Sequence, residues 1–457
     1  MRAPSHDSRS PERSWRWSWA CAGIVGIVAI AAFGYDLARE PHFPDESAYI
    51  SQSYFADLWL SGDVQNPEWL TWPAFDLTPL PKYLIGSALR IGGYRRPGPI
   101  DAYKWYNDIS YRPESPRMLW AARWPSVFLG ATGCIAIYAL GVLAADRRVG
   151  IVAALLLMVD PLYRMHARRA MSDVPAEALI LATAAVGLWV WQRTLAKGAE
   201  LGTWLAATAA GALAGLAVLC KLNGVLGLMI MAAWIVLAAA LPCFKFRRKF
   251  ALATAGLLAA GVAFGTFVAW NPFMTARPID PPPQLSELAA QDVWARARKI
   301  VAQRLEVSSG QQTMFAHNAL LGLGAKVKAV AVQGFGRFGP LGSRRFDPPS
   351  RQWAFDSTVR YDWEQDRGAL IWGPSFALGL LWAAKRGRQQ LRAGEPPTAW
   401  AILIQALVAL AVVTAFIPLA WDRYYLSIQP GSALLVAGVA VAAADALLHW
   451  LPGREEA

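Results

Sequence analysis

Long apolar runs with almost no charge constrain the fold of this chain more than any other feature. The longest, from Thr203 to Leu241, contains one charged residue, Lys221. As a continuous helix it would measure roughly 58 Å, whereas a bilayer core is about 30 Å thick and takes about 20 residues to cross. We therefore predict a helical hairpin that turns at residues 221–224. Only 17% of all residues are charged, against about a quarter in a soluble domain, so the chain is predicted to be an all-α polytopic membrane protein.

About ten apolar runs are candidates for membrane-spanning helices. The run 149–162 is short, and we retain it because its omission would place later basic clusters on the opposite side of the membrane. The run 18–37 follows a basic segment, as in a signal peptide, but no small-x-small cleavage site follows, so we interpret it as an uncleaved anchor. The predicted spans are residues 18–37, 119–144, 149–162, 174–192, 202–220, 224–243, 251–270, 368–384, 398–420 and 426–448.

Basic residues predict the orientation, because short cytoplasmic loops of membrane proteins are enriched in Lys and Arg. A basic N-terminus and four basic loops share one side of the predicted topology. That topology accounts for most of the formal net charge of +12, so no nucleic-acid partner is expected. The basic loops contain Arg147 and Arg148, Arg193 and Lys197, residues 245–249, and residues 385–392.

The same topology divides the chain into four segments. Residues 1–17 form a cytoplasmic segment, and residues 18–270 form a membrane module that includes a first large outer loop, 38–118. Residues 271–367 form a second outer loop, and residues 368–457 form the last spans and a cytoplasmic tail. Within the second loop, residues 284–304 carry apolar side chains at helical spacing with Arg and Lys between them. This pattern predicts an amphipathic helix on the bundle or on the membrane surface.

Several familiar cofactor and nucleotide motifs are missing from the sequence. The four cysteines lie in or beside apolar runs, which suits neither a disulfide framework nor a zinc site. There is no G-x-x-x-x-G-K-[ST] loop, and the glycine-rich run at residues 334–339 lacks the sequence context of a dinucleotide-binding fingerprint and is interpreted as a loop, so a soluble nucleotide is not the expected source of phosphate. No D-x-D pair surrounds Asp45, so a divalent metal is only weakly supported, and we predict no cofactor.

Charged and aromatic residues gather on the predicted outer face, close to the bilayer. They are Asp45, Glu46, Lys82, Arg168, Arg169, Asp173, Lys221, Arg423 and Tyr424. Each also has a purely structural interpretation. Asp45 could cap a helix, and Lys82 could be an interfacial lysine. A structural role is most strongly expected for Lys221, as a charge at the hairpin tip that reaches water. As a set they combine a carboxylate that can accept a hydroxyl proton with cations that can hold a phosphate. In a membrane, that phosphate would belong to a polyprenyl phosphate.

Five short motifs, taken in order, resemble one family. The chain is similar to the protein O-mannosyltransferases and aminoarabinose (lipid A) transferases, which are GT-C glycosyltransferases that use polyprenyl- or dolichyl-phosphate sugars. The resemblance is good over residues 43–225 and again near 420–430, and weak across 271–367. The motifs are Phe43-Pro44-Asp45-Glu46-Ser47-Ala48-Tyr49, Pro79-Leu80-Pro81-Lys82-Tyr83-Leu84, Arg123-Trp124-Pro125-Ser126, Arg168-Arg169-Ala170-Met171-Ser172-Asp173, and Arg423-Tyr424-Tyr425-Leu426 through Pro430.

The resemblance implies a GT-C-like bundle and an inverting transfer of sugar to an acceptor hydroxyl at the outer, periplasmic face of a bacterial inner membrane. It implies that Asp45 is the catalytic base, with Glu46 beside it. Lys82 and Arg423 would bind the lipid phosphate, assisted by Tyr424. The remaining members of the implied site, or of its surroundings, are Arg168, Arg169 and Asp173.

The acceptor stays open, because the sequence departs from the family pattern in two places. Thr78 stands where the proline-containing motif often begins with His, and the loop 271–367 is too short for the β-trefoil module of eukaryotic protein mannosyltransferases. A glycan, a lipid or a protein hydroxyl all remain candidates. The alternative functions are a lipid or lipid-linked-sugar flippase and an inactive scaffold of cell-envelope assembly. A transporter should show repeats and charged, broken spans, whereas the predicted spans here are nearly free of charge.

Overall fold

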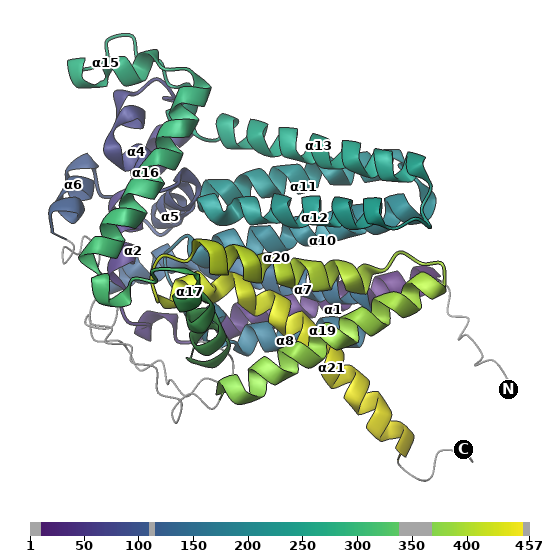
Figure 1. Cartoon of the computed structure of the whole chain (residues 1–457). Helices are drawn as coiled ribbons and strands as arrows, with labels where there is room; N and C mark the ends of the chain where they lie inside the picture. The colour runs from purple at the N-terminus through teal and green to yellow at the C-terminus, as the bar shows by residue number, and fades with distance from the viewer. Residues whose placement is uncertain (1–10, 109–114, 338–367, 451–457) are drawn as a thin grey trace.

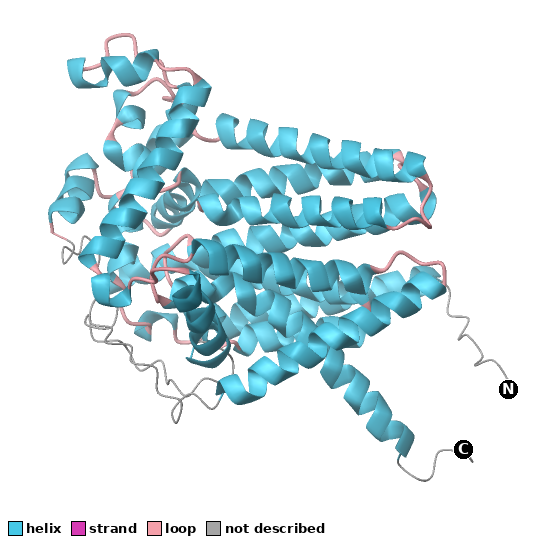
Figure 2. Cartoon of the chain, in the orientation of Figure 1, coloured by secondary structure: helices cyan, strands magenta, loops and turns pink. Residues whose placement is uncertain are grey.

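The computed structural model of this chain describes residues 11–108, 115–337 and 368–450 (Figure 1). Within these ranges the regular secondary structure is helical, and the one β-interaction is an isolated bridge between Ala319 and Leu419 (Figure 2). The all-α prediction is therefore confirmed.

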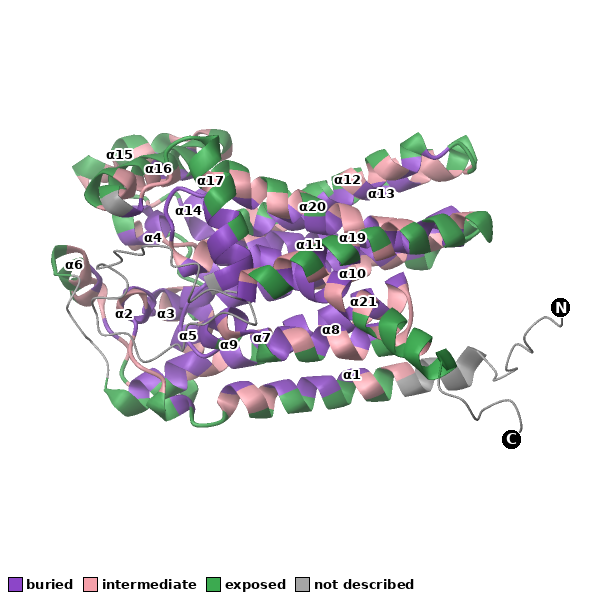
Figure 3. Ribbon diagram, turned by 60° about the horizontal axis from the view of Figure 1, so that its bottom comes forward, coloured by how far each residue is buried: buried purple, intermediate pink, exposed green. Residues whose placement is uncertain are grey.

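Long helices lie side by side in a bundle and form most of the structure (Figure 1). Their inward faces are buried and their outward faces are more exposed (Figure 3). Many large apolar residues are among the exposed ones. Ile27, Val236 and Leu257 are 70%, 68% and 75% exposed, which suits a surface covered by lipid rather than water. The bundle helices are α1 (Pro11–Gly34), α7 (Pro116–Ala144), α8 (Arg147–Val159), α10 (Asp173–Lys197), α11 (Leu201–Cys220), α12 (Leu226–Ala240), α13 (Phe246–Ala269), α19 (Gly368–Arg392), α20 (Thr398–Phe416) and α21 (Gln429–Trp450).

The number of spans differs from the predicted ten. Among the described residues, seven helices are long and apolar enough to cross a membrane, and eight if one bent pair counts as a span. Every predicted run is mostly helical, but the apolar part of α1 is short, Ser18–Gly34. Helix α19 falls outside the candidate spans because its second half carries the basic cluster that begins at Lys385.

The bent pair corrects the prediction of one continuous helix over residues 149–162. Helix α8 ends at Val159, and α9 (Pro161–Ala167) follows at an angle of 69°. Pro161 causes the break, because a residue before proline avoids the helical conformation. Asp160 adopts ψ 121° and accepts a hydrogen bond from the Tyr163 amide at 2.8 Å. The turn thereby begins a new helix that leads towards Arg168.

The predicted hairpin is confirmed. Helix α11 ends at Cys220, a short 3₁₀ turn covers Leu222–Val225, and α12 returns from Leu226. Gly224 is required there, because a Cβ atom at this position would lie 2.2 Å from the backbone of Ala217. The turn places Lys221 at the end of the bundle.

Short helices cover this end of the bundle (Figure 1). The amphipathic helix predicted over residues 284–304 is present as two helices, α15 and α16. The break lies before Asp292, which caps α16 because its carboxylate accepts a hydrogen bond from the Ala295 amide at 2.7 Å. Helix α16 packs against α4. These short elements are α2 (Pro44–Ser51), α3 (Phe55–Leu60), α4 (Trp72–Asp76), α5 (Pro79–Ile91), α6 (Pro99–Asn107), α15 (Pro283–Ala290), α16 (Val293–Met314) and α17 (Leu323–Ala329).

The predicted cytoplasmic loops meet at the other end of the bundle (Figure 1). There Arg248 donates to the Leu195 carbonyl at 2.7 Å, and Gln390 donates to the Ala144 carbonyl at 3.1 Å. The basic clusters and the polar residues at positions 45, 173 and 423 therefore lie at opposite ends of the bundle.

Candidate active site

Helix α2 directs the side chains of two adjacent acidic residues, Asp45 and Glu46, to different sides. Pro44 occupies its first turn, and the Glu46 carboxylate folds back to accept a hydrogen bond from the Phe43 amide at 2.9 Å. Neighbouring residues on a helix point in directions about 100° apart. Asp45 consequently faces a cavity, whereas Glu46 points into the protein.

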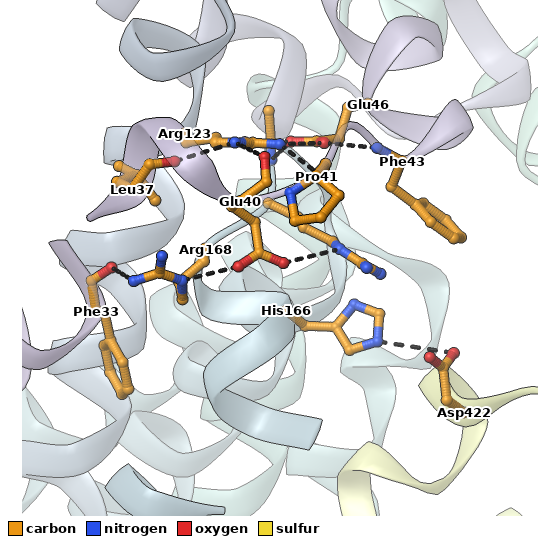
Figure 4. Close-up of polar contacts among 12 residues, drawn as sticks. Phe33, Leu37, Glu40, Pro41, Phe43, Glu46, Arg123, His166, Arg168 and Asp422 are labelled. Carbon is orange, nitrogen blue, oxygen red and sulfur yellow. Dashed lines mark hydrogen bonds and ion pairs between the residues drawn. The ribbon is translucent and has the colours of Figure 1, made fainter. Parts of the chain in front are cut away.

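Glu46 forms a fully buried pair with Arg123 of α7 (Figure 4). Both hydrogen bonds between the carboxylate and the guanidinium are 2.8 Å long, and the Ala170 amide donates a third at 2.8 Å. Arg123 also donates to the carbonyls of Leu37, Glu40 and Pro41 at 3.1, 2.7 and 3.0 Å.

The pair determines how Glu46 ionises. Burial alone would raise the pKa of Glu46, but the Arg123 charge and the hydrogen bonds to the carboxylate hold that pKa below its ordinary value. Glu46 thus joins α2, α7 and the turn before α10, and it does not line the cavity.

The two arginines of the turn after α9 also have partners outside the cavity. Arg168 donates to the Glu40 carboxylate at 2.9 Å and to the carbonyls of Phe33 and Asp36 at 2.9 and 3.0 Å. It therefore satisfies carbonyls at the C-terminal end of α1. Arg169 lies with its guanidinium 4.4 Å from the Phe43 ring centroid, and its Nε is 3.9 Å from Glu40.

Lys82 lies in the first turns of α5 and is fully buried. Its ammonium donates to the carbonyls of Pro73 and Ala74, the latter at 3.3 Å, and lies 4.9 Å from the Phe55 ring centroid. Burial lowers the pKa of Lys82 to about 7, although the nearby Asp76 carboxylate opposes that shift. In this structure Lys82 holds α4 in place and is not a lining residue of the cavity.

The other predicted site residues meet in one cavity of about 460 Å³. Asp45 forms an ion pair with Arg423, which lies 378 positions further along the chain. Asp173 accepts a hydrogen bond from Lys221 at 2.6 Å, and the Lys221 ammonium is 5.9 Å from the Tyr424 ring centroid. Lys221 lies at the tip of the hairpin and is 31% exposed, and it is also paired with Asp173 and lines the cavity.

Arg423 lies in a short 3₁₀ segment, Asp422–Ile428, that leads into α21. Its guanidinium stacks over the Trp421 ring at 4.7 Å from the centroid. Trp421 covers one flat face of the guanidinium and leaves the N–H groups at its edge available to a carboxylate or phosphate.

Asp422 lies beside Arg423 and also lines the cavity. The residue is only 3% exposed. Its Oδ2 has no hydrogen-bond partner in the described part of the protein, and neither ring nitrogen of His166 has one. The imidazole Nε2 lies 3.8 Å from Asp422 Oδ1 (Figure 4). This wall of the cavity is therefore polar and incompletely hydrogen-bonded.

Sequence reasoning missed a second group of lining residues. These come from α4, α6 and α16, and they include Trp72, Asp76, Trp105, Tyr106 and Arg304. None stands next to an apolar span in the sequence. Their one shared signal is a place in the outer loops, which many surface residues have too. Among the described residues, no group of three or more His, Cys, Asp or Glu is arranged to hold a metal ion.

Comparisons with known proteins match the central part of the sequence and the fold. Residues 75–270 match the model of the dolichyl-phosphate-mannose-protein mannosyltransferase family. No curated protein matches the sequence at a significant level.

Two solved structures share the fold across nearly the whole chain. The oligosaccharyltransferase AglB from Archaeoglobus fulgidus, in complex with an inhibitory peptide and a dolichol-phosphate, is 14% identical with a TM-score of 0.54. That match covers 96% of this chain and 52% of AglB. ArnT from Cupriavidus metallidurans, in the apo state, is 16% identical with a TM-score of 0.50, and the match covers 95% of this chain and 60% of ArnT.

This chain thus spans only about half the length of the archaeal enzyme. Its apolar helices and its fold are those of an integral, multi-pass membrane protein. The chain has the fold of the GT-C membrane glycosyltransferases, and its central region resembles the dolichyl-phosphate-mannose-protein mannosyltransferases.

Proposed function

We propose that this protein is an inverting glycosyltransferase that transfers a sugar from a polyprenyl phosphate to an acceptor hydroxyl. The observation that carries the proposal is the meeting of Asp45 and Arg423 in one cavity at the end of the membrane bundle. The family match and the shared fold support it, and so does the dolichol-phosphate bound to AglB.

In the proposed reaction, Asp45 accepts the proton of the acceptor hydroxyl. The acceptor oxygen attacks the anomeric carbon, and the bond between that carbon and the phosphate oxygen breaks. Arg423 and Lys221, both in the cavity, stabilise the charge that develops on the departing phosphate. The products are the glycosylated acceptor and the free polyprenyl phosphate, with the anomeric configuration inverted.

The ion pair between Asp45 and Arg423 gives the donor phosphate a second effect. The Asp45 carboxylate accepts a hydrogen bond from Arg423, so the donor phosphate competes with it for the same guanidinium. A phosphate that takes over this contact releases Asp45 when the anomeric carbon arrives beside it, which couples donor binding to activation of the base.

A transfer assay with purified protein tests the proposed activity. A panel of radiolabelled polyprenyl-phosphate sugars is offered together with membrane, glycan and protein fractions. We expect the label from at least one donor to leave the lipid and enter one fraction. If a folded preparation releases no sugar from any donor, the proposal is wrong.

The role of Arg423 can be tested by its replacement with Gln. We expect the rate at low donor concentration to fall by about ten- to a hundredfold, because one charge-assisted hydrogen bond contributes roughly 1.5–3 kcal/mol. Arg298 on α16 is exposed and does not line the cavity, so Arg298→Gln is the matched control and should remain near wild type. Equal kinetics for the Arg423 variant and the control at every donor concentration would disprove the phosphate-binding role.

We further place the cavity on the periplasmic face of a bacterial inner membrane, because the basic loops lie at the opposite end of the bundle. Reporter fusions after Arg148, Lys197, Lys249 and Arg392 should report the cytoplasm. Fusions near Gly62 and Pro281 should report the outside. A periplasmic signal from the Lys249 fusion would contradict this orientation, because that loop lies at the end opposite the cavity.

A further inference from the structure

A second part of the cavity wall comes entirely from elements outside the membrane bundle. Helices α4, α6 and α16 contribute it, and all three lie beyond the end of the long helices (Figure 1). None of these elements is a candidate span. The proposed reaction of Asp45 and Arg423 makes no use of this part of the wall.

Its polar groups are held in fixed positions. Asp76 accepts hydrogen bonds from Tyr106 and from Arg304, both at 2.6 Å. Gln52 donates to the Tyr106 hydroxyl at 2.9 Å. The Arg304 side chain is still 32% exposed, so its remaining donors can reach a ligand. A carboxylate and a guanidinium are therefore oriented at the cavity surface before any ligand binds.

Aromatic rings surround these polar groups. The Trp72 ring packs edge-on against Tyr106 and Phe75, with centroids 6.5 and 5.6 Å apart. Trp72 nevertheless stays 41% exposed. The Trp105 ring is 5.1 Å from Tyr106, and its Nε1 is enclosed without a hydrogen-bond partner. The wall thus offers broad aromatic faces beside an unused donor.

This combination suits a sugar ring. A pyranose has an apolar face of C–H groups, which packs on the electron-rich face of Trp or Tyr, and a rim of hydroxyls, which bond to carboxylate, guanidinium and indole groups. We infer that Trp72, Asp76, Trp105, Tyr106 and Arg304 bind a sugar residue of the acceptor, which is therefore a glycan. This inference rests on the proposed function.

The location favours the acceptor over the donor. Lys221 and Arg423 lie where the spans end, within reach of a lipid phosphate, and a donor sugar is one bond away from that phosphate. Helices α4, α6 and α16 lie further out, on the side from which a water-soluble chain approaches.

Binding to the donor-free, full-length protein tests the inference without turnover. Methyl glycosides and neutral trisaccharides serve as probes, observed by saturation-transfer NMR in detergent. We expect Trp72→Leu and Asp76→Asn to weaken the binding of the best probe by about tenfold or more, and Trp72→Phe to retain most of it. Trp294 is 61% exposed and stacks on Phe264 away from the cavity, so Trp294→Leu should change nothing.

Two further additions decide what occupies this part of the cavity. A loaded polyprenyl-phosphate sugar should leave saccharide binding intact, and displacement of the probe would show that the donor sugar occupies these residues instead. A Ser/Thr-containing peptide should not compete, and a peptide that does so through Trp72 would overturn the inference. It would also be overturned if no saccharide bound, or if Trp72→Leu and Asp76→Asn bound as wild type does. Failure of transfer with every donor would refute the proposed function and leave these binding results unchanged.

Discussion

Replacement of Asp45 by Asn is expected to lower the single-turnover rate of sugar transfer by about 10²- to 10⁴-fold, the usual contribution of a positioned general base. Asn keeps the shape and hydrogen-bonding reach of Asp45 but cannot accept the hydroxyl proton. Donor binding should be unchanged or tighter, because the carboxylate that competes with the phosphate for Arg423 is gone. The measurement is transfer from a labelled donor, together with a separate donor-binding assay.

The paired measurement distinguishes catalysis from a structural role. The residue that caps α2 is Phe43, and Asp45 lies inside the first turn, where Asn changes helix stability little. Asp57 forms an ion pair with Arg96 and does not line the cavity, so Asp57→Asn controls for the loss of an outer carboxylate. A folded Asp45→Asn protein that transfers sugar within a few-fold of this control would remove the base from the mechanism. Weaker donor binding would argue against the competition for Arg423.

The helices were predictable because the bilayer imposes a simple rule on composition and length. Uncharged runs of about 20 residues and alternating basic loops were enough to identify the hairpin at Lys221 and the end of the bundle that carries Asp45. The break at Asp160-Pro161 was missed because apolar content does not report a change of direction. The count of ten is not confirmed, because α19 combines apolar and basic turns and its composition alone does not decide whether it spans the membrane.

The candidate site was only partly predictable, for a different reason. Proximity to the bilayer identified Asp45, Asp173, Arg423 and Tyr424, which the structure brings into the cavity. A motif does not say in which direction each neighbour points: the resemblance favoured Asp45 as the base but also placed Glu46 in the site, whereas Glu46 is buried against Arg123. The same holds for Lys82, Arg168 and Arg169, whose catalytic or phosphate-binding roles stay predictions.

The contacts of the outer wall arise only in the folded chain. Asp76 and Arg304 are 228 positions apart and meet because α16 crosses α4. Each of the two outer loops alone shows an ordinary charged residue. No spacing rule relates Asp76 to Arg304, so this aromatic and charged part of the cavity wall could not be predicted from the sequence.

Replacement of Arg123 by Met is expected to destabilise the protein by about 3–5 kcal/mol, because the Glu46 carboxylate is left buried and unpaired. Removal of both charges in Arg123→Met/Glu46→Gln should restore part of that loss. Arg148 and Asp445 form an exposed pair, 60% and 40% accessible, so Arg148→Met should cost at most about 1 kcal/mol. Thermal unfolding in detergent, followed for the four proteins, measures these differences.

The pH dependence separates a lost ion pair from a simple loss of packing. In the wild type the pKa of Glu46 is lower in the folded than in the unfolded protein. Its stabilisation is therefore complete above about pH 4.3, the ordinary value for Glu, and is lost as the pH falls through the lower folded value. In Arg123→Met, burial without a partner raises the pKa of Glu46. Lowering the pH then protonates the buried carboxylate and reduces the destabilisation, so the gap in stability between variant and wild type should narrow as the pH falls from about 8 to about 5. A gap that stays constant with pH would mean that Arg123 contributes packing and backbone hydrogen bonds, and that Glu46 does not need its charge.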